Sequence, residues 1–386
     1  MFNKLLISLW IVFFGVLFLY SFTQIDLGLT LTRASFFQVV QTSFQYIGYF
    51  IRPLSTYLFI GIVLCGSVLY ALTLYRIYKK KFSLKSVWIL VILGSFLAFS
   101  YNAFSYDFFN YIFDAKIVTV YGENPYVKKA LDYPADPMLG FMHWTHRTYP
   151  YGPVWLGITV PLSFVGMGYF SITFLLFKIL SLLSYVLSAV LIGKICRKTK
   201  LTQPALAIAF FALSPFVLIE GLVSAHIDLP MMVLALLGVY LLFVQKKYSA
   251  WIVLLVSAGV KFATIFLLPL FAWFPFSKRP NKEFIFILLS IILMCIGTYL
   301  QSARTNFQPW YFLLVLPFAA LLASRLYIAV PVILFSVLVL FQYVPFLYTG
   351  NFDPPIPGIM NQMLYVSIAL SVVSLGIIVI YKKIRT

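Results

Sequence analysis

Charged residues are scarce in this 386-residue chain, and acidic residues are the scarcest of them. Asp, Glu, Lys and Arg together make up 10% of the chain, against about 25% in an ordinary soluble domain, while 62% of the residues are hydrophobic. This balance excludes a soluble globular protein and indicates a polytopic membrane protein. Cysteine is also rare. Cys65, Cys196 and Cys295 are odd in number and lie far apart in apolar segments, which excludes a disulfide framework and a cysteine metal cluster.

The net charge of +18 would suggest a nucleic-acid partner in a soluble chain, but here the basic residues form short clusters after apolar runs. Such clusters are typical of cytoplasmic loops, so no nucleic-acid partner is predicted. The clusters are Arg76 with Lys79–Lys81, Lys194 with Arg197 and Lys198, Lys246 with Lys247, Lys278 with Arg279, and Lys382 with Lys383. Placing all of them inside puts both termini inside and nine of the ten acidic residues at or beyond the outer face.

Apolar runs near the length that crosses a bilayer, about 20 residues, predict one all-α transmembrane domain over residues 1–386 with about 10 to 12 spans. The clearest are 5–22, 53–75, 86–104, 171–193, 203–222, 229–245, 284–300, 311–323, 326–345 and 360–381. The first run has no small-residue cleavage site after it and is expected to be a retained helix. The orientation requires that 152–168 does not cross fully. It also requires that 248–276, which contains Lys261, enters and returns as a hairpin or as two spans.

Half of the acidic residues fall in one stretch between two hydrophobic blocks. They are Asp107, Asp114, Glu123, Asp132 and Asp136. A carboxylate beside a bilayer is costly unless it is solvated or paired, so this cluster predicts a functional site. An ordinary hydrated loop is the alternative, but the stretch also holds histidines, an arginine and many tyrosines, and that variety favours function. We therefore predict an exoplasmic catalytic loop over 105–152, preceded by additional amino-terminal helices within 1–85.

Residues 105–122 predict a short interfacial helix ending near Gly122, whose aromatic residues rest in the headgroup layer. These aromatic residues are Phe108, Phe109, Tyr111 and Phe113. Asp107 and Asp114 share one face of this helix about 10 Å apart, too far to share a proton, so separate roles are expected. Six basic or histidine side chains are candidates to hold a phosphate together. They are Lys116, Lys128, Lys129, His143, His146 and Arg147. No third ligand accompanies the two histidines, so no metal is predicted.

The loop contains, in order, SYD, YIFDAK, GENPY and TYPYGPVWL. After it come SPFVLIEGLVSAHIDLPMMVLALLGVYLL, SAGVKFATIFLLPL and TNFQPWYFLLVLP. Over residues 100–320 these motifs resemble integral-membrane glycosyltransferases of the GT-C superfamily. The resemblance is closest to polyprenol-phosphate-mannose-dependent mannosyltransferases and glycosyltransferase family 87. The part of the chain before residue 86 has no clear counterpart in the simplest members.

The resemblance implies an inverting transferase that moves a sugar, most commonly mannose, from a polyprenyl-phosphate donor to a glycan or lipid-linked acceptor. It implies no cofactor, a multi-pass location in the cell membrane, and a site on the exoplasmic side. Asp107 occupies the family's general-base position, and capping of the helix is its alternative role. The candidate substrate-binding residues are Asp114, Lys116, Asn124, Tyr126, His143, His146, Arg147, Tyr151, Lys178, His226, Asp228, Gln308 and Trp310.

Several of these residues have a second interpretation. Asp114 either binds the acceptor sugar or pairs with Lys116 or Lys129, and Lys178 either reaches a lipid phosphate or snorkels to the interface. His226 and Asp228 either face the loop or cap a helix, while Gln308 and Trp310 are more simply part of an aromatic belt. The competing function is a transporter or flippase for a lipid-linked sugar. Lys261 in its hairpin favours that function, and the gathering of acidic residues at one face opposes it.

Overall fold

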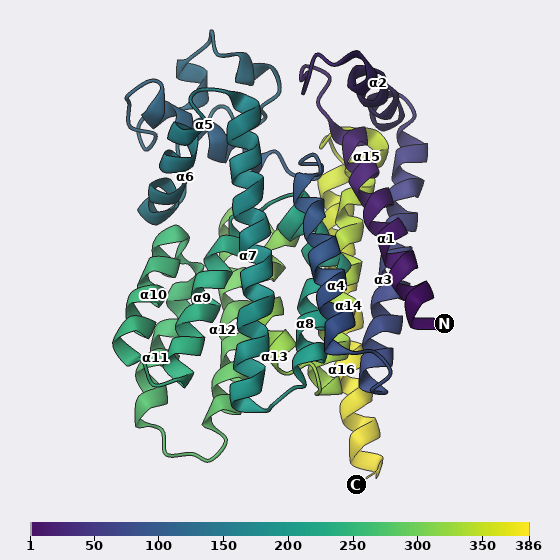
Figure 1. The fold of residues 1–386 in the computed structure, drawn as a ribbon, viewed down its shortest axis with the longest axis vertical. Coiled ribbons are helices and arrows are strands. Elements are labelled where there is room, and N and C mark those ends of the chain that lie inside the picture. Colours follow the sequence, from purple (N-terminus) through teal and green to yellow (C-terminus); the bar gives the residue numbers. More distant parts are fainter. Residues whose placement is uncertain (1, 386) are drawn as a thin grey trace.

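The amino-terminal part of the protein contains three helices along the bundle and one across its end. The computed structural model describes residues 2–385, which contain helices and loops but no strand. The first elements are α1 (Phe2–Ser21), η1 (Phe22–Gln24), α2 (Ser35–Tyr49), α3 (Arg52–Tyr78), α4 (Leu84–Ser95) and η2 (Phe96–Phe99). Helices α1, α3 and α4 run along the bundle, whereas α2 lies at the end of the molecule that also carries α5 (Figure 1). The sequence predicts no membrane span over α2, and α2 is not among the helices that are long and apolar enough to cross a membrane.

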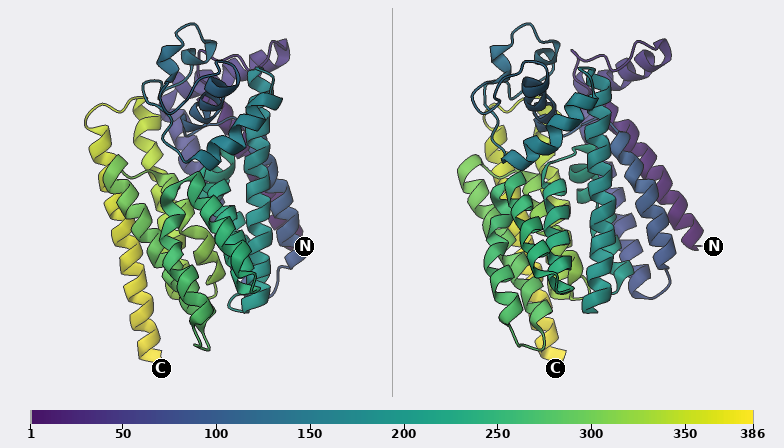
Figure 2. Two further views of the ribbon diagram at one scale, coloured as in Figure 1. Left: turned by 90° about the vertical axis from the view of Figure 1, so that its left-hand side faces the viewer. Right: turned by 60° about the vertical axis from the view of Figure 1, so that its left-hand side comes forward.

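A layer of short helices and loops covers that same end of the bundle (Figures 1 and 2). It contains α5 (Asp107–Thr119), η3 (Ala130–Asp132), η4 (Pro137–Gly140) and α6 (Pro153–Val165). We call residues 100–152 of this layer the outer loop. Helix α6 has 13 residues and is therefore about 20 Å long, too short for a hydrocarbon core of about 30 Å. The chain then turns directly into α7 on the same side.

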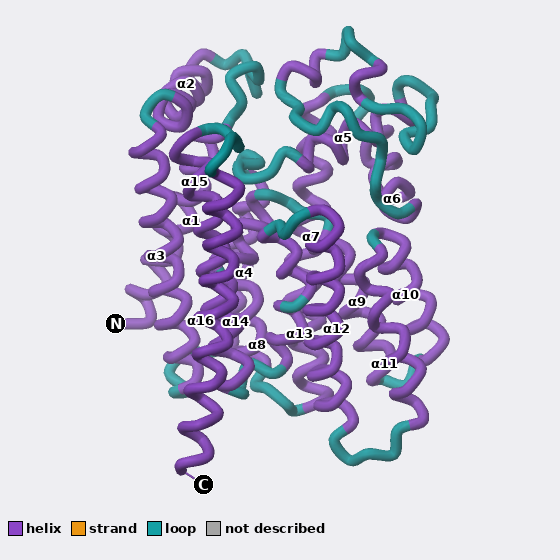
Figure 3. The backbone as a smooth tube through the Cα atoms, turned by 180° about the vertical axis from the view of Figure 1, so that it is seen from behind, coloured by secondary structure: helices purple, strands orange, loops and turns teal. Residues whose placement is uncertain are grey.

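The remaining helices form the main bundle, seen from behind in Figure 3. They are α7 (Phe170–Thr199), α8 (Pro204–Ala212), η5 (Val217–Val223), α9 (Asp228–Phe243), α10 (Lys247–Val260), η6 (Phe262–Leu267), α11 (Leu268–Trp273), η7 (Phe274–Phe276), α12 (Lys282–Thr305), η8 (Pro309–Leu314), α13 (Leu316–Leu321), α14 (Leu326–Leu338), η9 (Val339–Gln342), α15 (Tyr343–Thr349) and α16 (Ile356–Arg385). Many are short, because the chain breaks its helices repeatedly in this region.

Six helices within the described range are long and apolar enough to span a membrane. They are Phe2–Gln24, Arg52–Tyr78, Phe170–Thr199, Lys282–Thr305, Leu326–Thr349 and Ile356–Lys382. A seventh span results if α8 and η5, bent by 64°, count as one. Six further apolar helices have only 10–17 residues, so the predicted count of 10 to 12 spans is not confirmed. Apolar composition does not reveal where a helix breaks. Pro215, for example, interrupts the predicted span 203–222 because proline lacks the N–H that a continuing helix requires.

Helix α5 is buried inside the protein, and the prediction that its aromatic residues rest in the headgroup layer is wrong. Residues 107–115 and 117 are all buried. The Phe108 ring packs edge-on against Phe174 and Phe177 of α7. The Phe109 ring packs against Phe141 of the outer loop and Phe170 of α7. Contact with α7 therefore fixes the helix that begins at Asp107.

The basic clusters lie at the opposite end of the bundle from the outer loop. In Figure 1 the carboxyl-terminal ends of α3 and α7, the loop between η7 and α12, and the carboxyl terminus all lie at that end. These segments carry the basic clusters that contain Arg76, Lys194, Lys278 and Lys382. The fold thus places these basic clusters at one end of its long axis and the acidic outer loop at the other.

The end of the outer loop docks on the turn between α10 and η6. The Gly152 N–H donates to the Val260 carbonyl oxygen at 3.0 Å. A Cβ atom at Gly152 would lie 2.1 Å from the Gly259 carbonyl oxygen, so only glycine allows the two backbones to approach this closely.

Gly152→Ala should lower the free energy of unfolding by about 1–3 kcal/mol, because the added methyl group overpacks this contact. The measurement is thermal unfolding in detergent micelles. Gly157→Ala in α6 is the matched control, since nothing lies within 4 Å of its Cβ position and alanine favours a helix by about 1 kcal/mol. Equal unfolding temperatures for the two variants would show that the close approach is unimportant.

Candidate active site

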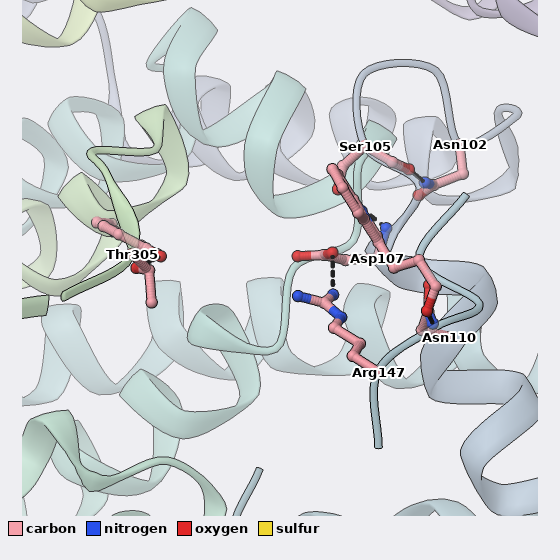
Figure 4. A network of polar contacts seen from close by, with 8 residues as sticks. Asn102, Ser105, Asp107, Asn110, Arg147 and Thr305 are labelled. Carbon is pink, nitrogen blue, oxygen red and sulfur yellow. Dashed lines mark hydrogen bonds and ion pairs between the residues drawn. The ribbon is translucent and has the colours of Figure 1, made fainter. Parts of the chain in front are cut away.

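Asp107 forms an ion pair at the start of α5. Its backbone N–H donates to Ser105 Oγ at 3.2 Å, while its Oδ1 accepts a hydrogen bond from Arg147 Nη2 at 2.8 Å. Figure 4 shows the carboxylate and the guanidinium meeting, with the segment that carries Thr305 across from them. Within residues 2–385 no hydrogen bond is made to Asp107 Oδ2, and 11% of the side chain is exposed. The carboxylate thus has one oxygen fixed and one free to accept a proton, and it makes no capping bond.

The outer loop holds Arg147 in place through bonds on both sides of it. The Asn110 side chain donates Nδ2–H to the Trp144 carbonyl oxygen at 2.9 Å, which ties the loop to α5. Thr148 forms a backbone bridge with Lys129, and the Trp144 ring lies 5.4 Å from the guanidinium. Arg147 therefore reaches Asp107 from a segment fixed at several points.

Opposing influences set the pKa of Asp107. Burial raises it, the charge and hydrogen bond of Arg147 lower it, and the net result lies above the ordinary 3.8. The Lys261 charge also lowers this pKa, and the Asp228 charge raises it. Asp107 is therefore a stronger base than a free aspartate. A second ion pair, from another part of the chain, also affects its pKa.

That second pair joins Asp228 and Lys261. Asp228 begins α9 and is buried, and its Oδ1 lies 2.8 Å from Lys261 Nζ. Lys261 has an extended backbone (φ −154°, ψ 134°) between α10 and η6, at the point where the hairpin of residues 247–276 reverses. Its ammonium lies 4.9 Å from the Tyr311 ring centroid, and 15% of the side chain is exposed. Sequence reasoning left Lys261 unassigned, although a lysine inside an apolar hairpin is itself a signal of function.

A buried polar group lies beside this second pair. The His226 ring stacks on Trp310 with centroids 4.1 Å apart, and its Nε2 lies 3.3 Å from Glu220 Oε2. The Tyr343 hydroxyl donates to Glu220 Oε1 at 2.8 Å. Sequence reasoning missed Glu220 and Tyr343 as site residues. An acid within an apolar run was the available signal for Glu220, whereas nothing in the sequence singled out Tyr343.

Four side-chain atoms between η5 and the start of α9 are buried without a hydrogen-bond partner in the described structure. They are Ser224 Oγ, both ring nitrogens of His226 (Nδ1 and Nε2) and Asp228 Oδ2. An unsatisfied buried polar atom typically costs about 1–3 kcal/mol. In a native protein such atoms are paired with water, an ion or a ligand, or they serve catalysis.

Lys178 is not exposed to a lipid phosphate or to the interface, so its predicted snorkelling is wrong. The side chain is fully buried. Its Nζ donates to the carbonyl oxygens of Leu222 and Val223 at 3.2 and 2.6 Å. These carbonyls lie at the end of η5, where the helix leaves them without backbone donors. Lys178 therefore stabilises the break that precedes His226.

The predicted phosphate cluster is dispersed, and only Arg147 reaches Asp107. Lys116 pairs with Asp136 at 2.5 Å, and Lys128 pairs with Glu123 at 3.1 Å. His143 stacks on Tyr106 with centroids 3.5 Å apart. His146 lies in the loop near Trp144. The spacing of these residues suggested proximity, but each is held by its own local partner. Among residues 2–385 no group of three or more His, Cys, Asp or Glu is placed to hold a metal ion.

Asp114 makes no hydrogen bond or ion pair within the described residues, so the predicted pairing with Lys116 or Lys129 is wrong. Burial raises its pKa to about 8, with a smaller lowering by Arg147 and a smaller raising by Asp107. The carboxyl is therefore largely protonated at neutral pH, and it lies two helical turns from Asp107 on the same helix.

The remaining predicted site residues lie in three places: the exposed turn of the outer loop, the surroundings of Asp107, and the position before η8. Asn124 Oδ1 accepts the Tyr126 N–H at 3.0 Å, and the Tyr126 hydroxyl donates to the Tyr151 carbonyl at 3.3 Å, so both shape the exposed turn. Tyr151 packs on Tyr111 near Asp107, whose charge acts on it. Gln308 precedes η8 and accepts the Tyr311 N–H through its backbone at 3.1 Å.

Comparison with known proteins gives one match. The family model MptA_B, described as Alpha-(1->6)-mannopyranosyltransferase, N-terminal domain, matches residues 14–277 of the 386. Neither a curated protein nor a solved structure matches the chain. The family match confirms the resemblance that the loop motifs indicate, and it extends into the amino-terminal helices.

Asp114→Asn should make the protein progressively more stable than the wild type as the pH rises from about 4 to about 8. The folded protein keeps the Asp114 proton up to about pH 8, whereas the unfolded chain releases it near 3.8. The free energy of unfolding of the wild type therefore falls across this window, and asparagine removes that loss.

Thermal unfolding of the two proteins at about pH 5 and about pH 8 measures this effect. The control is Asp132→Asn, which removes an exposed carboxylate and should have the same effect at both pH values. A constant difference between Asp114→Asn and the wild type would contradict a buried, protonated Asp114.

Proposed function

We propose a mannosyl-transfer reaction for this chain, which belongs to the MptA_B family of alpha-(1->6)-mannopyranosyltransferases. The protein is therefore a multi-pass membrane glycosyltransferase, and the transporter alternative is not favoured. The proposed donor is a polyprenyl-phosphate-linked mannose. The proposed acceptor is the 6-hydroxyl group of a mannose in a glycan or lipid-linked chain. The observation that carries the proposal is the Asp107 carboxylate, which has one oxygen held by Arg147 and the other free.

Asp107 acts as the general base. A sugar hydroxyl is a poor nucleophile at neutral pH, so a positioned carboxylate must accept its proton as the oxygen attacks C1 of the donor. The new C1–O bond forms on the face opposite the lipid phosphate. The bond from C1 to the phosphate oxygen breaks, and its electron pair leaves with the phosphate. This single displacement inverts C1, so a β-linked donor gives the α-linkage in the family's name.

The two cations keep the reaction electrically balanced. Asp107 loses its negative charge on protonation while the departing phosphate gains one, so the negative charge moves across the site and its total stays constant. Arg147 and Lys261 remain positive throughout and favour this transfer of charge. We assign Lys261 to the phosphate, because Arg147 is bonded to the base whereas the carboxylate that Lys261 pairs with is Asp228, which is not the base.

The buried polar atoms beside Lys261 suit recognition of the sugar. Ser224 Oγ, His226 Nδ1 and Asp228 Oδ2 lack partners within residues 2–385, and sugar hydroxyls supply both donors and acceptors. Trp310, stacked on His226, offers an apolar ring at the same place. We assign these residues to the mannosyl group or to the acceptor.

The reaction takes place at the exoplasmic face in this proposal. The basic clusters lie at the end of the bundle opposite Asp107 (Figure 1), and basic loops face the cytoplasm in most membrane proteins. A lipid-linked donor presents its phosphate at the headgroup level of a leaflet, which is where the outer loop meets the bundle.

Asp107→Asn should lower transfer of labelled mannose from polyprenyl-phosphate-mannose by roughly a hundredfold or more, the usual scale for loss of a general base. The assay uses membranes that contain equal amounts of each protein. Activity of the wild type should also fall on acidification, through a pKa above 3.8. The exposed Asp132→Asn is the control and should retain activity. Equal transfer by Asp107→Asn and the wild type would exclude Asp107 as the base.

The double variant Lys261→Met/Asp228→Asn should transfer mannose about 100 to 1,000 times more slowly than Asp228→Asn alone, which keeps the cation. The double variant avoids leaving a buried carboxylate without its partner, which is strongly destabilising. Initial rates over a range of donor concentrations measure the effect. Equal rates for the single and double variants would exclude Lys261 as the phosphate ligand.

A further inference from the structure

Helix α2 turns Gln41, Gln45 and Gly48 toward the protein and an apolar stripe outward. Gln41 Nε2 donates to the Leu29 carbonyl at 2.6 Å, and Gln45 Nε2 donates to the Asp26 carbonyl at 2.9 Å. At Gly48 a Cβ atom would lie 1.7 Å from the Thr23 carbonyl oxygen. These three positions share one face of the helix, and Phe37 and Phe44 next to that face pack on Phe22, so hydrogen bonds and apolar contacts together fix α2 to the chain beneath it.

The opposite face carries an apolar stripe that no described residue covers. Phe36, Val39, Tyr46 and Phe50 have exposed fractions of 81, 66, 57 and 67%. With Ser43 they recur every three or four residues, which places them on one side of a helix with 3.6 residues per turn. That side is directly opposite Gln41, Gln45 and Gly48. An exposed apolar stripe of this kind marks a contact with a membrane or with another protein.

The position of α2 identifies what covers the stripe. Figure 2 shows α2 extending sideways beyond the ends of α1 and α3, at the level of the outer loop. The stripe continues along the chain into the apolar exposed residues Ile51, Leu54 and Leu58, which belong to or precede the span Arg52–Tyr78. Because the exposed side of a span faces lipid, a surface continuous with it lies at the edge of the same bilayer.

The inner end of α2 contacts the segment that carries the base. The Tyr49 and Tyr106 side chains lie close enough for each to affect the pKa of the other, and Tyr106 directly precedes Asp107. Tyr106 also stacks on His143, whose Nε2 lies 4.0 Å from Asp26 Oδ2. Asp26 belongs to the turn that Gln45 binds. Helix α2 and the outer loop are therefore linked by one chain of contacts.

We propose that α2 is an interfacial helix whose apolar stripe lies in the outer leaflet, and that it holds the start of α5 at the headgroup level through the contacts that join Asp26, His143 and Tyr106. This gives the amino-terminal helices a role in the enzyme. They set the height of Asp107 relative to the lipid surface, where a lipid-linked phosphate lies. The occupant of the stripe is lipid. A second copy of the chain and another protein are the competing occupants.

Nitroxide labels placed one at a time by Phe36→Cys, Val39→Cys and Tyr46→Cys test the lipid contact. The background carries Cys65→Ser, Cys196→Ala and Cys295→Ser, and the protein is reconstituted in lipid nanodiscs. All three labels should be relaxed by oxygen more than by a water-soluble nickel chelate, as a label at Leu64 of α3 should be. A label at Val127, exposed on the outer loop, should show the reverse.

Each other result of the labelling overturns the proposal. Accessibility to the nickel chelate at all three positions would place the stripe in water. Accessibility to neither reagent would show that protein covers it. Neither readout depends on mannosyl transfer, so the lipid contact can fail while the proposed reaction stands, and the reverse also holds.

Hydrogen exchange tests the link to the outer loop. The variant Phe36→Ser/Val39→Ser/Tyr46→Ser and the variant His143→Ala, which removes the ring stacked on Tyr106, should each show roughly tenfold faster amide exchange over residues 105–111 than the wild type, because local opening becomes easier. Val127→Ser/Leu131→Ser removes two exposed apolar side chains of the outer loop and is the matched control for the first variant. Size-exclusion chromatography confirms that each variant is folded. Unchanged exchange in both test variants would contradict the link.

Discussion

Two ion pairs at the junction between the outer loop and the bundle organise this protein. Asp107 with Arg147 and Asp228 with Lys261 place two carboxylates and two cations close enough for their charges to interact. Each carboxylate is buried, and a buried charge is tolerable only beside a partner. The arrangement is neutral as a whole and holds one oxygen of Asp107 free. The rest of the fold can be understood as the scaffold that brings these four side chains together.

Breaks in the helices supply the positions for these side chains. Asp228 follows the break between η5 and α9, Lys261 lies at the reversal between α10 and η6, and Trp310 lies in η8. Irregular backbone at membrane depth is tolerated only where protein or a cavity satisfies its polar groups. Lys178 does this for the carbonyls of Leu222 and Val223. Lys178, which the sequence suggested as a substrate ligand, therefore stabilises the backbone break that precedes the candidate ligand His226.

The outer loop is held from two sides. On one side Gly152 binds the hairpin tip, and on the other Tyr106 stacks on His143, whose Nε2 lies 4.0 Å from Asp26 Oδ2 in the amino-terminal part of the chain. The aromatic side chains of α5 fill the space between them and pack on α7. This explains why a helix that looks amphipathic and interfacial in sequence is buried, while the helix that does expose an apolar stripe is α2.

Composition alone determined the class of this protein, because 62% hydrophobic and 10% charged residues cannot form a soluble domain. The clustering of acidic residues between hydrophobic blocks, together with the loop motifs, was enough to predict the transferase family and to select Asp107 and Arg147 as candidates. These are local properties of the chain. The number of spans was not predictable from these local properties, because the length of an apolar run does not reveal where a helix bends or reverses.

Only the tertiary structure decided which charged side chains meet. Asp107 and Arg147 are 40 residues apart, Asp228 and Lys261 are 33 apart, and Glu220 and Tyr343 are 123 apart. Neighbours in sequence such as Lys116, Lys128 and His143 instead found separate partners. A charge or an aromatic ring in the sequence states what a residue is able to bind. Its actual partner depends on how helices from distant parts of the chain pack, and that packing is set by the whole apolar surface.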